Sequence, residues 1–316
     1  MQRTEYPLLS PSLGSQKTLV AFHFGVAGAG PKVYIQASLH AEELPGMLVA
    51  HHLRERLEAA EREGHFCGEV ILVPAANPIG LSQRLDHRAM GRFEFDTAQN
   101  FNRHYPDMAA AVLEDALPLM GNDAGANVDT VRRLVGQWLT QWQPASELES
   151  LRRQLLLLSH DADLVLDLHC DTEAVMHLYS EEACWAPFEP LARLLGCRAV
   201  LLARESGGGP FDERLSGLWW QLAAAVKKAG VTAPLPQACA STTVELRGEA
   251  DVSHELARQD AQAIEAFLLH AGVLGGQPSP TLPPMACEPT PLAGSQTLRS
   301  PVPGVLVFLA RPGDRL

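Results

Sequence analysis

The sequence predicts an α/β protein with a mixed, largely parallel central sheet flanked by helices, followed by a small C-terminal all-β module. Short apolar runs alternate with longer amphipathic runs, which is typical of strand–helix–strand units with parallel strands. The chain has 316 residues, 46% of them hydrophobic and 20% charged, so it can bury a core of ordinary size. A stretch rich in Pro and Gly near residue 275 separates this large domain from the final residues.

The first strand–helix–strand unit lies before residue 80. Residues 18–24 and 32–38 are rich in β-branched and aromatic side chains and enclose a Gly-rich segment, which predicts a strand pair with a turn. Residues 46–62 repeat apolar side chains at helical spacing and carry charges on the opposite face. Residues 68–78 then predict a buried strand that stops at an Asn-Pro pair.

The rest of the chain continues the alternation. Residues 106–160 are mostly helical in character, with a loop expected at 121–129. Residues 161–171 predict a second buried strand, and polar residues crowd its C-terminal end. Further strands are expected at 174–180, 198–203 and 241–248, and a further helix at 254–272.

Composition divides the chain into three parts. Residues 1–274 form the predicted α/β domain. Residues 275–295 are rich in Pro, Gly and Ser and are interpreted as a linker. Residues 296–316 predict the start of a small β module, a strand–turn–strand that stops before it is complete.

Charge and cysteine usage restrict the function classes. A net charge of −12 argues against a nucleic-acid binder, which needs clustered Lys and Arg, but leaves a small anionic substrate open. The six cysteines form no C-x-x-C pair and predict free thiols in a reducing compartment. There is no apolar signal segment at the N-terminus and no run of about 18 apolar residues, so we expect a cytoplasmic protein without membrane association. A homo-oligomer is compatible with the sequence.

His40 and Glu43 follow the predicted strand at 32–38. In open α/β sheets, ligands bind in the crevice beyond the carboxyl ends of the strands. A histidine and a glutamate three residues apart can direct an imidazole and a carboxylate at one point, and zinc accepts both ligands. By themselves, the two residues are also compatible with a solvated histidine beside an acidic helix start, which is the commoner arrangement.

His169 ends the second buried strand, with Asp167 two residues earlier on the same face. A lone histidine at such a position is more often a core residue satisfied by a backbone carbonyl. With His40 and Glu43, however, it completes a set of two histidines and one carboxylate at strand ends. That set predicts a metal site, and Asp167 is a candidate to orient the ligand His169. A water on such a metal becomes a nucleophile near neutral pH.

Glu245 lies near the end of the β-branched strand at 241–248. A carboxylate within an apolar strand is costly unless it is paired or functional. Glu245 is therefore a candidate general base, and Thr243 and Arg247 would share its face. The alternative is an edge strand with Glu245 in solvent.

The segment between residues 84 and 103 is rich in arginine, whose guanidinium suits carboxylate binding through two parallel hydrogen bonds. Asn102 would add an amide donor beside Arg103. Arg84, Arg88 and Arg92 precede this pair, and an ordinary surface loop remains an alternative for the first two.

Several short motifs occur together in one order. They are H-x-x-E at 40 and 43, N-P at 77, N-R at 102, D-L-H at 167 and T-V-E-L-R at 243. In this order they resemble the zinc carboxypeptidase superfamily, and within it the succinylglutamate desuccinylase/aspartoacylase group. "ANPIGL", "NFNRHYPD" and the C-terminal "PVPGVL" are typical of that group. The resemblance covers most of the chain and implies a zinc carboxypeptidase-like fold, with residues 1–274 as a zinc-dependent catalytic domain.

The resemblance also implies roles for individual residues. His40, Glu43 and His169 would bind one zinc ion per chain. Glu245 would act as general base toward a metal-activated water. In the same way, Asn102 and Arg103 would hold a substrate carboxylate, and Arg92 would polarise the scissile carbonyl, with Arg84 or Arg88 as alternatives for that role. No tyrosine matches the position that closes over the substrate in the family.

The implied activity is hydrolysis of the amide bond of an N-acyl amino acid or a related small carboxylate-bearing amide. The alternatives are a metallocarboxypeptidase acting on peptide C-termini and a catalytically silent zinc-binding homologue. A phosphate-binding module is disfavoured because the chain has neither a P-loop nor G-x-G-x-x-G after a strand. "SGGGP" at 206–210 is interpreted as a loop beside the site. Glu42, next to Glu43, is expected to point elsewhere and to be dispensable.

Overall fold

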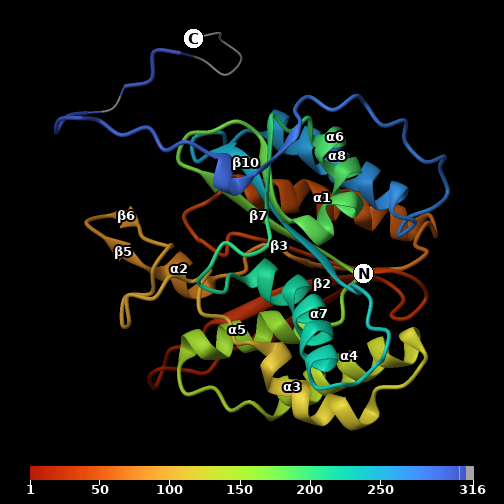
Figure 1. Cartoon of the computed structure of the whole chain (residues 1–316). Coiled ribbons are helices and arrows are strands. Elements are labelled where there is room, and N and C mark those ends of the chain that lie inside the picture. Colours follow the sequence, from red (N-terminus) through yellow and green to blue (C-terminus); the bar gives the residue numbers. More distant parts are fainter. Residues whose placement is uncertain (306, 311–316) are drawn as a thin grey trace.

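A computed structural model describes residues 1–305 and 307–310. Within this part of the chain, nine strands form one sheet in the order β1-β2-β4-β3-β7-β10-β8-β9-β11 (Figure 1). The strands are β1 (Gln2–Pro7), β2 (Thr18–Gly25), β3 (Lys32–Ala37), β4 (Glu69–Val73), β7 (Leu164–Asp171), β8 (His177–Glu181), β9 (Ala199–Ala203), β10 (Ala240–Gly248) and β11 (Pro289–Pro291). Strands β4, β3, β7 and β10 run parallel to one another, whereas β8 is antiparallel to β10. The predicted fold class is confirmed.

Helices cover both faces of the sheet. They are α1 (Pro45–Arg62), α2 (Pro78–Ser82), α3 (Met108–Ala116), α4 (Ala124–Gln141), α5 (Glu147–Ser159), α6 (Trp185–Leu195), α7 (Phe211–Lys228) and α8 (His254–His270). Helices α1, α6 and α8 pack on one face, and α3, α4, α5 and α7 on the other (Figure 1). Side chains of β3 alternate between the two cores, with Val33 and Ile35 in one and Tyr34 in the other. Within the described residues, no helix is long and apolar enough to span a membrane.

The strands expected at 18–24 and 32–38 do not pair with each other, so this part of the prediction is wrong. Both strands form, but β4 lies between β2 and β3, antiparallel to the first and parallel to the second. The intervening glycines explain this arrangement. A side chain at Gly25 or Gly30 would collide with the backbone carbonyls of Gly68 or Cys67, which lead into β4. The Gly-rich segment does turn, with the amide of Ala29 donating to the carbonyl of Val26, but its glycines also let the backbone that leads into β4 approach closely.

Other departures concern element boundaries. The loop expected at 121–129 is shorter, because α4 begins inside it, and Asp123 caps the helix by accepting a hydrogen bond from the amide of Ala126. The sequence did not identify β1, α6 or α7. Helix α7 matters most for function, because it begins directly after the Gly-rich loop at 206–210 and contributes to the site described below.

The C-terminal stretch differs in part from its expected organisation. Residues 289–291, inside the expected linker, form β11 and extend the sheet parallel to β9. The described residues beyond it, 296–305 and 307–310, contain no strand. Residues 306 and 311–316 of the expected β module lie outside the described residues, so that module stays a prediction.

Candidate active site

Three neighbouring parallel strands bring the predicted site residues to one edge of the sheet. His40 follows β3, His169 lies near the end of β7, and Glu245 lies near the end of β10. Strand β7 pairs with both of the others, and Glu245 stands directly opposite His169 in the register. Residues far apart in sequence therefore meet where α/β sheets bind ligands.

The turn after β3 is held in a strained conformation. Ser38 has φ +58°, in the left-handed region that is uncommon for residues other than glycine. Its hydroxyl donates to the carbonyl oxygen of Glu43 at 2.8 Å. The side-chain amide of Asn77 donates to the carbonyl oxygen of Leu39 at 2.8 Å. The Asn-Pro motif thus supports the loop that carries His40.

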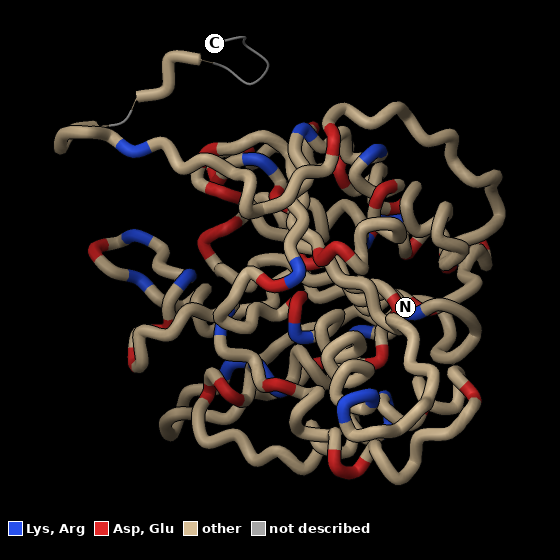
Figure 2. Tube along the Cα trace, in the orientation of Figure 1, with Lys and Arg blue, Asp and Glu red and all other residues tan. Residues whose placement is uncertain are grey.

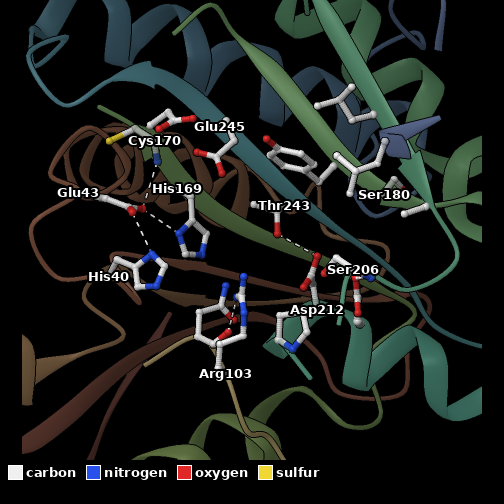
Figure 3. Close-up of a pocket in the computed structure, with 18 of the residues that line it drawn as sticks. His40, Glu43, Arg103, His169, Cys170, Ser180, Ser206, Asp212, Thr243 and Glu245 are labelled. Atoms are coloured by element: carbon white, nitrogen blue, oxygen red, sulfur yellow. Dashed lines mark hydrogen bonds and ion pairs between the residues drawn. The ribbon is translucent and has the colours of Figure 1, made fainter. Parts of the chain in front are cut away.

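His40, Glu43 and His169 converge in one buried cluster (Figure 3). His40 Nδ1 lies 2.9 Å from Glu43 Oε1, and His169 Nδ1 lies 2.7 Å from Glu43 Oε2. One ligand atom of each residue lies within 4.8 Å of the other two. Two imidazole nitrogens and a carboxylate are the donor set of a catalytic zinc that keeps a position open for water. The residues present therefore fit the metal that the motifs predict.

The second ring nitrogen of each histidine also lies beside a polar side chain. His40 Nε2 forms a hydrogen bond of 2.9 Å with the side-chain oxygen of Asn100. His169 Nε2 lies 3.1 Å from Asp167 Oδ2, an ion-pair contact without hydrogen-bond geometry. Asp167 in turn accepts a hydrogen bond from Gln36 at 3.0 Å. Such partners fix the orientation of metal-binding imidazoles. Asn100 was not predicted, although it begins the same "NFNR" segment as Asn102.

Charge is balanced within this cluster. Burial alone would raise the pKa of Glu43, but His169 and His40 outweigh it and hold that pKa well below its usual range. Burial acts to lower the pKa of His169, whereas Asp167 and Glu43 raise it well above the usual histidine value. The carboxylates and imidazoles of this cluster therefore stabilise each other's charged forms.

Glu245 has the properties required of a general base. Its Oε2 is buried and has no hydrogen-bond partner within the described part of the chain. Burial raises the pKa of Glu245 to about 7, against an opposing effect of His169. A carboxylate with a pKa near the working pH transfers protons in both directions efficiently.

The arginines occupy different environments. Arg92 lines the cavity and donates to Glu43 Oε1 at 2.7 Å. Arg84 and Arg88 lie on the exposed hairpin formed by β5 (Arg84–Leu85) and β6 (Arg88–Ala89). Of the three arginines considered for the carbonyl-polarising role, only Arg92 lies beside the candidate metal ligands.

Asn102 and Arg103 both line the cavity. The side-chain oxygen of Asn102 accepts a hydrogen bond from the amide of Phe211 at 2.9 Å, which leaves its NH₂ group to face a ligand. Arg103 donates to the backbone carbonyl of Asn102 at 2.6 Å.

Arg247 does not share the face of Glu245. The register between β10 and β7 shifts after Glu245, and Arg247 has φ +65°. Its guanidinium instead forms an ion pair with Asp260 on α8. The expectation of a common face is wrong because an irregularity in the strand turns the side chain away.

One cavity of about 370 Å³ is lined by the three candidate metal ligands and by Glu245, Arg92, Asn102 and Arg103, and it extends beyond them. Its far end is lined by Tyr179 and Glu181 from β8 and by Asp212 and Glu213 from α7. The Gly-rich loop contributes Ser206, in line with its expected place beside the site. The acidic first turn after Pro210 is a recognisable helix start, but nothing in the sequence placed it against β10, where Asp212 contacts Thr243.

The fold and the site together place a candidate metal-binding cluster at the carboxyl edge of a mixed α/β sheet. Residues 29–271 match the family model of the succinylglutamate desuccinylase/aspartoacylase catalytic domain. The chain therefore belongs to the succinylglutamate desuccinylase/aspartoacylase family, as its motifs indicated. No curated protein sequence matches it.

Solved structures agree with this assignment. A succinylglutamate desuccinylase/aspartoacylase family protein from Shewanella amazonensis is 28% identical, with a TM-score of 0.78 over 95% of this chain and 80% of the other. A second, from Shewanella frigidimarina, is 26% identical, with a TM-score of 0.79 over 99% and 82%. A protein of this group from Rhodobacter sphaeroides shares the fold at 17% identity, with a TM-score of 0.55 over 88% and 67%.

Proposed function

We propose that this protein is a zinc-dependent amidohydrolase that removes the acyl group from an N-acyl amino acid or a related small carboxylate-bearing amide. One observation carries the proposal. The convergent His40, Glu43 and His169 share a cavity with the half-buried Glu245, whose buried Oε2 has no hydrogen-bond partner among the described residues. Membership of a family of desuccinylases and aspartoacylases supports hydrolysis as the reaction class.

Zinc held by His40, Glu43 and His169 would lower the pKa of a water and polarise a carbonyl group. Glu245 takes a proton from the attacking water and then gives it to the leaving amine. Arg92 stabilises the negative charge that develops on the carbonyl oxygen.

Asn102 and Arg103 supply donors for the substrate carboxylate at the same wall of the cavity. Figure 2 shows Lys and Arg scattered over the described chain and not gathered into a stripe. This distribution favours a small-molecule substrate over a nucleic acid.

The decisive experiment is Glu245→Gln assayed on a panel of N-acyl amino acids, with metal content measured in parallel. Turnover is expected to fall by about 10²- to 10⁴-fold while zinc stays bound, because the variant loses only the proton-transfer group. Glu249→Gln is the matched control, because Glu249 is an exposed acid just beyond the same strand. Near-wild-type turnover of Glu245→Gln with zinc bound would exclude the proposed mechanism.

The panel also separates the rival activities. Efficient removal of C-terminal residues from longer peptides would identify a metallocarboxypeptidase. A complete lack of turnover with stoichiometric zinc would identify a catalytically silent zinc-binding protein.

A further inference from the structure

The end of the cavity farthest from the candidate metal ligands is acidic. Glu181 comes from β8, whereas Asp212 and Glu213 come from the first turn of α7. None of the three forms an ion pair with a lysine or arginine among the described residues. We call Glu181, Asp212 and Glu213 the distal acids.

Two of the distal acids are almost completely buried. Asp212 is 8% exposed, and its Oδ2 accepts a hydrogen bond from Thr243 Oγ1 at 2.8 Å (Figure 3). No other side chain among the described residues donates a hydrogen bond to Asp212, which lines the cavity, and the backbone amide of Glu213 lies beside its carboxylate. Glu181 is 5% exposed, and the indole N–H of Trp220 donates to it at a long 3.4 Å.

Buried carboxylates without a cationic partner are energetically costly. Burial raises the pKa of Glu181 to about 8 and that of Asp212 to about 6. The N-terminus of α7 favours negative charge and accounts for part of the stability of Asp212 and Glu213. It does not account for Glu181, which lies on a different element.

Neighbouring arginines do not supply the missing cation. Arg103 is hydrogen-bonded to the carbonyl of Asn102. Arg204 lies over the ring of Trp220, 4.3 Å from its centroid, and forms no ion pair with Glu181. Within the described residues, no lysine or arginine lies within ion-pair distance of the distal acids, although Arg103 lines the same cavity. A cation bound beside them would favour the charged form of Glu181, whose pKa is raised by burial.

We propose that the distal acids bind a cationic group of the substrate, so that the preferred substrate is an N-acyl derivative of a basic amino acid. This inference rests on the proposed function and refines it by naming the substrate class. Glu245 and Thr243 lie two residues apart on β10, which is a spacing of about 7 Å, and Thr243 contacts Asp212 directly. An ammonium group on an extended side chain therefore reaches the distal acids while the amide lies beside Glu245.

The test uses binding of the released amino acid and does not depend on turnover. Isothermal titration calorimetry on the zinc-loaded full chain would compare L-lysine and L-ornithine with uncharged L-norleucine and anionic L-glutamate. A basic amino acid is expected to bind at least about tenfold more tightly than norleucine, because it alone neutralises the buried acids. Glu181→Gln and Asp212→Asn should each reduce this preference, because they remove charge while keeping the acceptors for Trp220 and Thr243.

The matched control is Glu182→Gln, which removes the same charge from the exposed neighbour of Glu181 and should leave the preference unchanged. The unfolding midpoint of each variant verifies that it is folded. Equal or tighter binding of norleucine or glutamate, absence of binding by either basic amino acid, or an unchanged preference in both distal variants would overturn the inference. Lysine binding without hydrolysis of any acyl-lysine would instead keep the subsite and reject the proposed amidohydrolase function.

Discussion

The two ends of the cavity bury carboxylates to a similar extent but differ in how they neutralise them. Glu43 is 1% exposed and its pKa is held low, because two imidazoles outweigh the effect of burial. Glu181 and Asp212 are 5% and 8% exposed, and burial raises their pKa values to about 8 and 6. The presence of a cationic partner, and not burial, therefore decides the charge of these acids.

The carboxylate at one end of the cavity already has its charge partners in the protein, whereas the carboxylates at the other end do not. At the end that holds the candidate ligands His40, Glu43 and His169, called the metal end, each candidate ligand has a polar partner within the protein, so the proposed site is organised before substrate arrives. At the distal end, no described lysine or arginine pairs with the acids, and a cationic ligand is proposed to supply that charge. The predictions below test this comparison, beginning with the largest expected effect.

Removing the carboxylate of the metal end should have the largest effect. In Glu43→Ala, metal content should fall from about one zinc per chain to near zero, and turnover should fall by more than about 10³-fold, because the site loses its only carboxylate ligand. Elemental analysis and steady-state kinetics measure the two effects, and circular dichroism verifies the fold. Stoichiometric zinc in the folded variant would show that Glu43 is not a ligand.

Neutralising a distal acid should stabilise the protein, but only at high pH. The folded-state pKa of Glu181 is raised to about 8 from an ordinary value of 4.5. The folded state therefore binds more protons than the unfolded state between these pH values, and stability declines as pH rises through that range. Glu181→Gln should remove this decline and be more stable than the wild type at pH 9, by on the order of 2–4 kcal/mol.

The same comparison at pH 4 provides the control, because Glu181 is then protonated in both folded and unfolded states and the gain should vanish. Urea unfolding of the metal-free protein measures the difference at both pH values, because zinc leaves the protonated histidines at pH 4. An equal gain at both pH values would attribute the effect to packing and not to charge.

The sequence predicted the residues of the metal end but not those of the distal end, and the reason is physical. His40, His169 and Glu245 each stand at the end of a strongly apolar strand, and parallel strands bring their carboxyl ends to one edge, so periodicity was sufficient to group them. Asp212 lies in the first turn of an unrecognised helix, and its contact with Thr243 on β10 depends on the path of the loop before it. No local pattern encodes such a contact.

The same distinction holds for the fold. The parallel centre of the sheet followed from apolar runs alternating with helices. The insertion of β4 between β2 and β3 depended on backbone contacts at Gly25 and Gly30 that only the structure reveals. The sequence pattern of β10 is that of a regular strand, so it did not predict the irregularity that turns Arg247 toward Asp260.

Substitution of the side chains beside the two histidines should have an intermediate effect on zinc affinity. In Asn100→Ala, His40 Nε2 loses its side-chain partner, and in Asp167→Asn, the negative charge beside His169 is lost. Each variant should bind zinc about 10- to 100-fold more weakly, as expected for groups that orient a ligand without touching the metal. Competition with a chelator of known affinity measures this change. Unchanged affinity in both variants would mean that the imidazoles are oriented by packing alone.

Substitution of Glu42 should have the smallest effect. It is also the most discriminating comparison, because Glu42 neighbours Glu43 and carries the same carboxylate. It accepts a hydrogen bond from the amide of Gly91, and its Oε1 lies 3.6 Å from Arg92 Nε. Its side chain is 22% exposed, compared with 1% for Glu43. Neither contact involves a metal ligand, so Glu42 supports the loop that carries Arg92 without belonging to the metal end.

Glu42→Ala should therefore retain about one zinc per chain and lose about 1 kcal/mol of stability, the usual effect of one hydrogen bond. Its KM should change by less than about threefold, because a partly exposed ion pair contributes little to the position of Arg92. Metal analysis, urea unfolding and kinetics beside Glu43→Ala measure all three. Loss of zinc from Glu42→Ala would show that the metal end extends to this residue, and the contrast between adjacent glutamates would no longer hold.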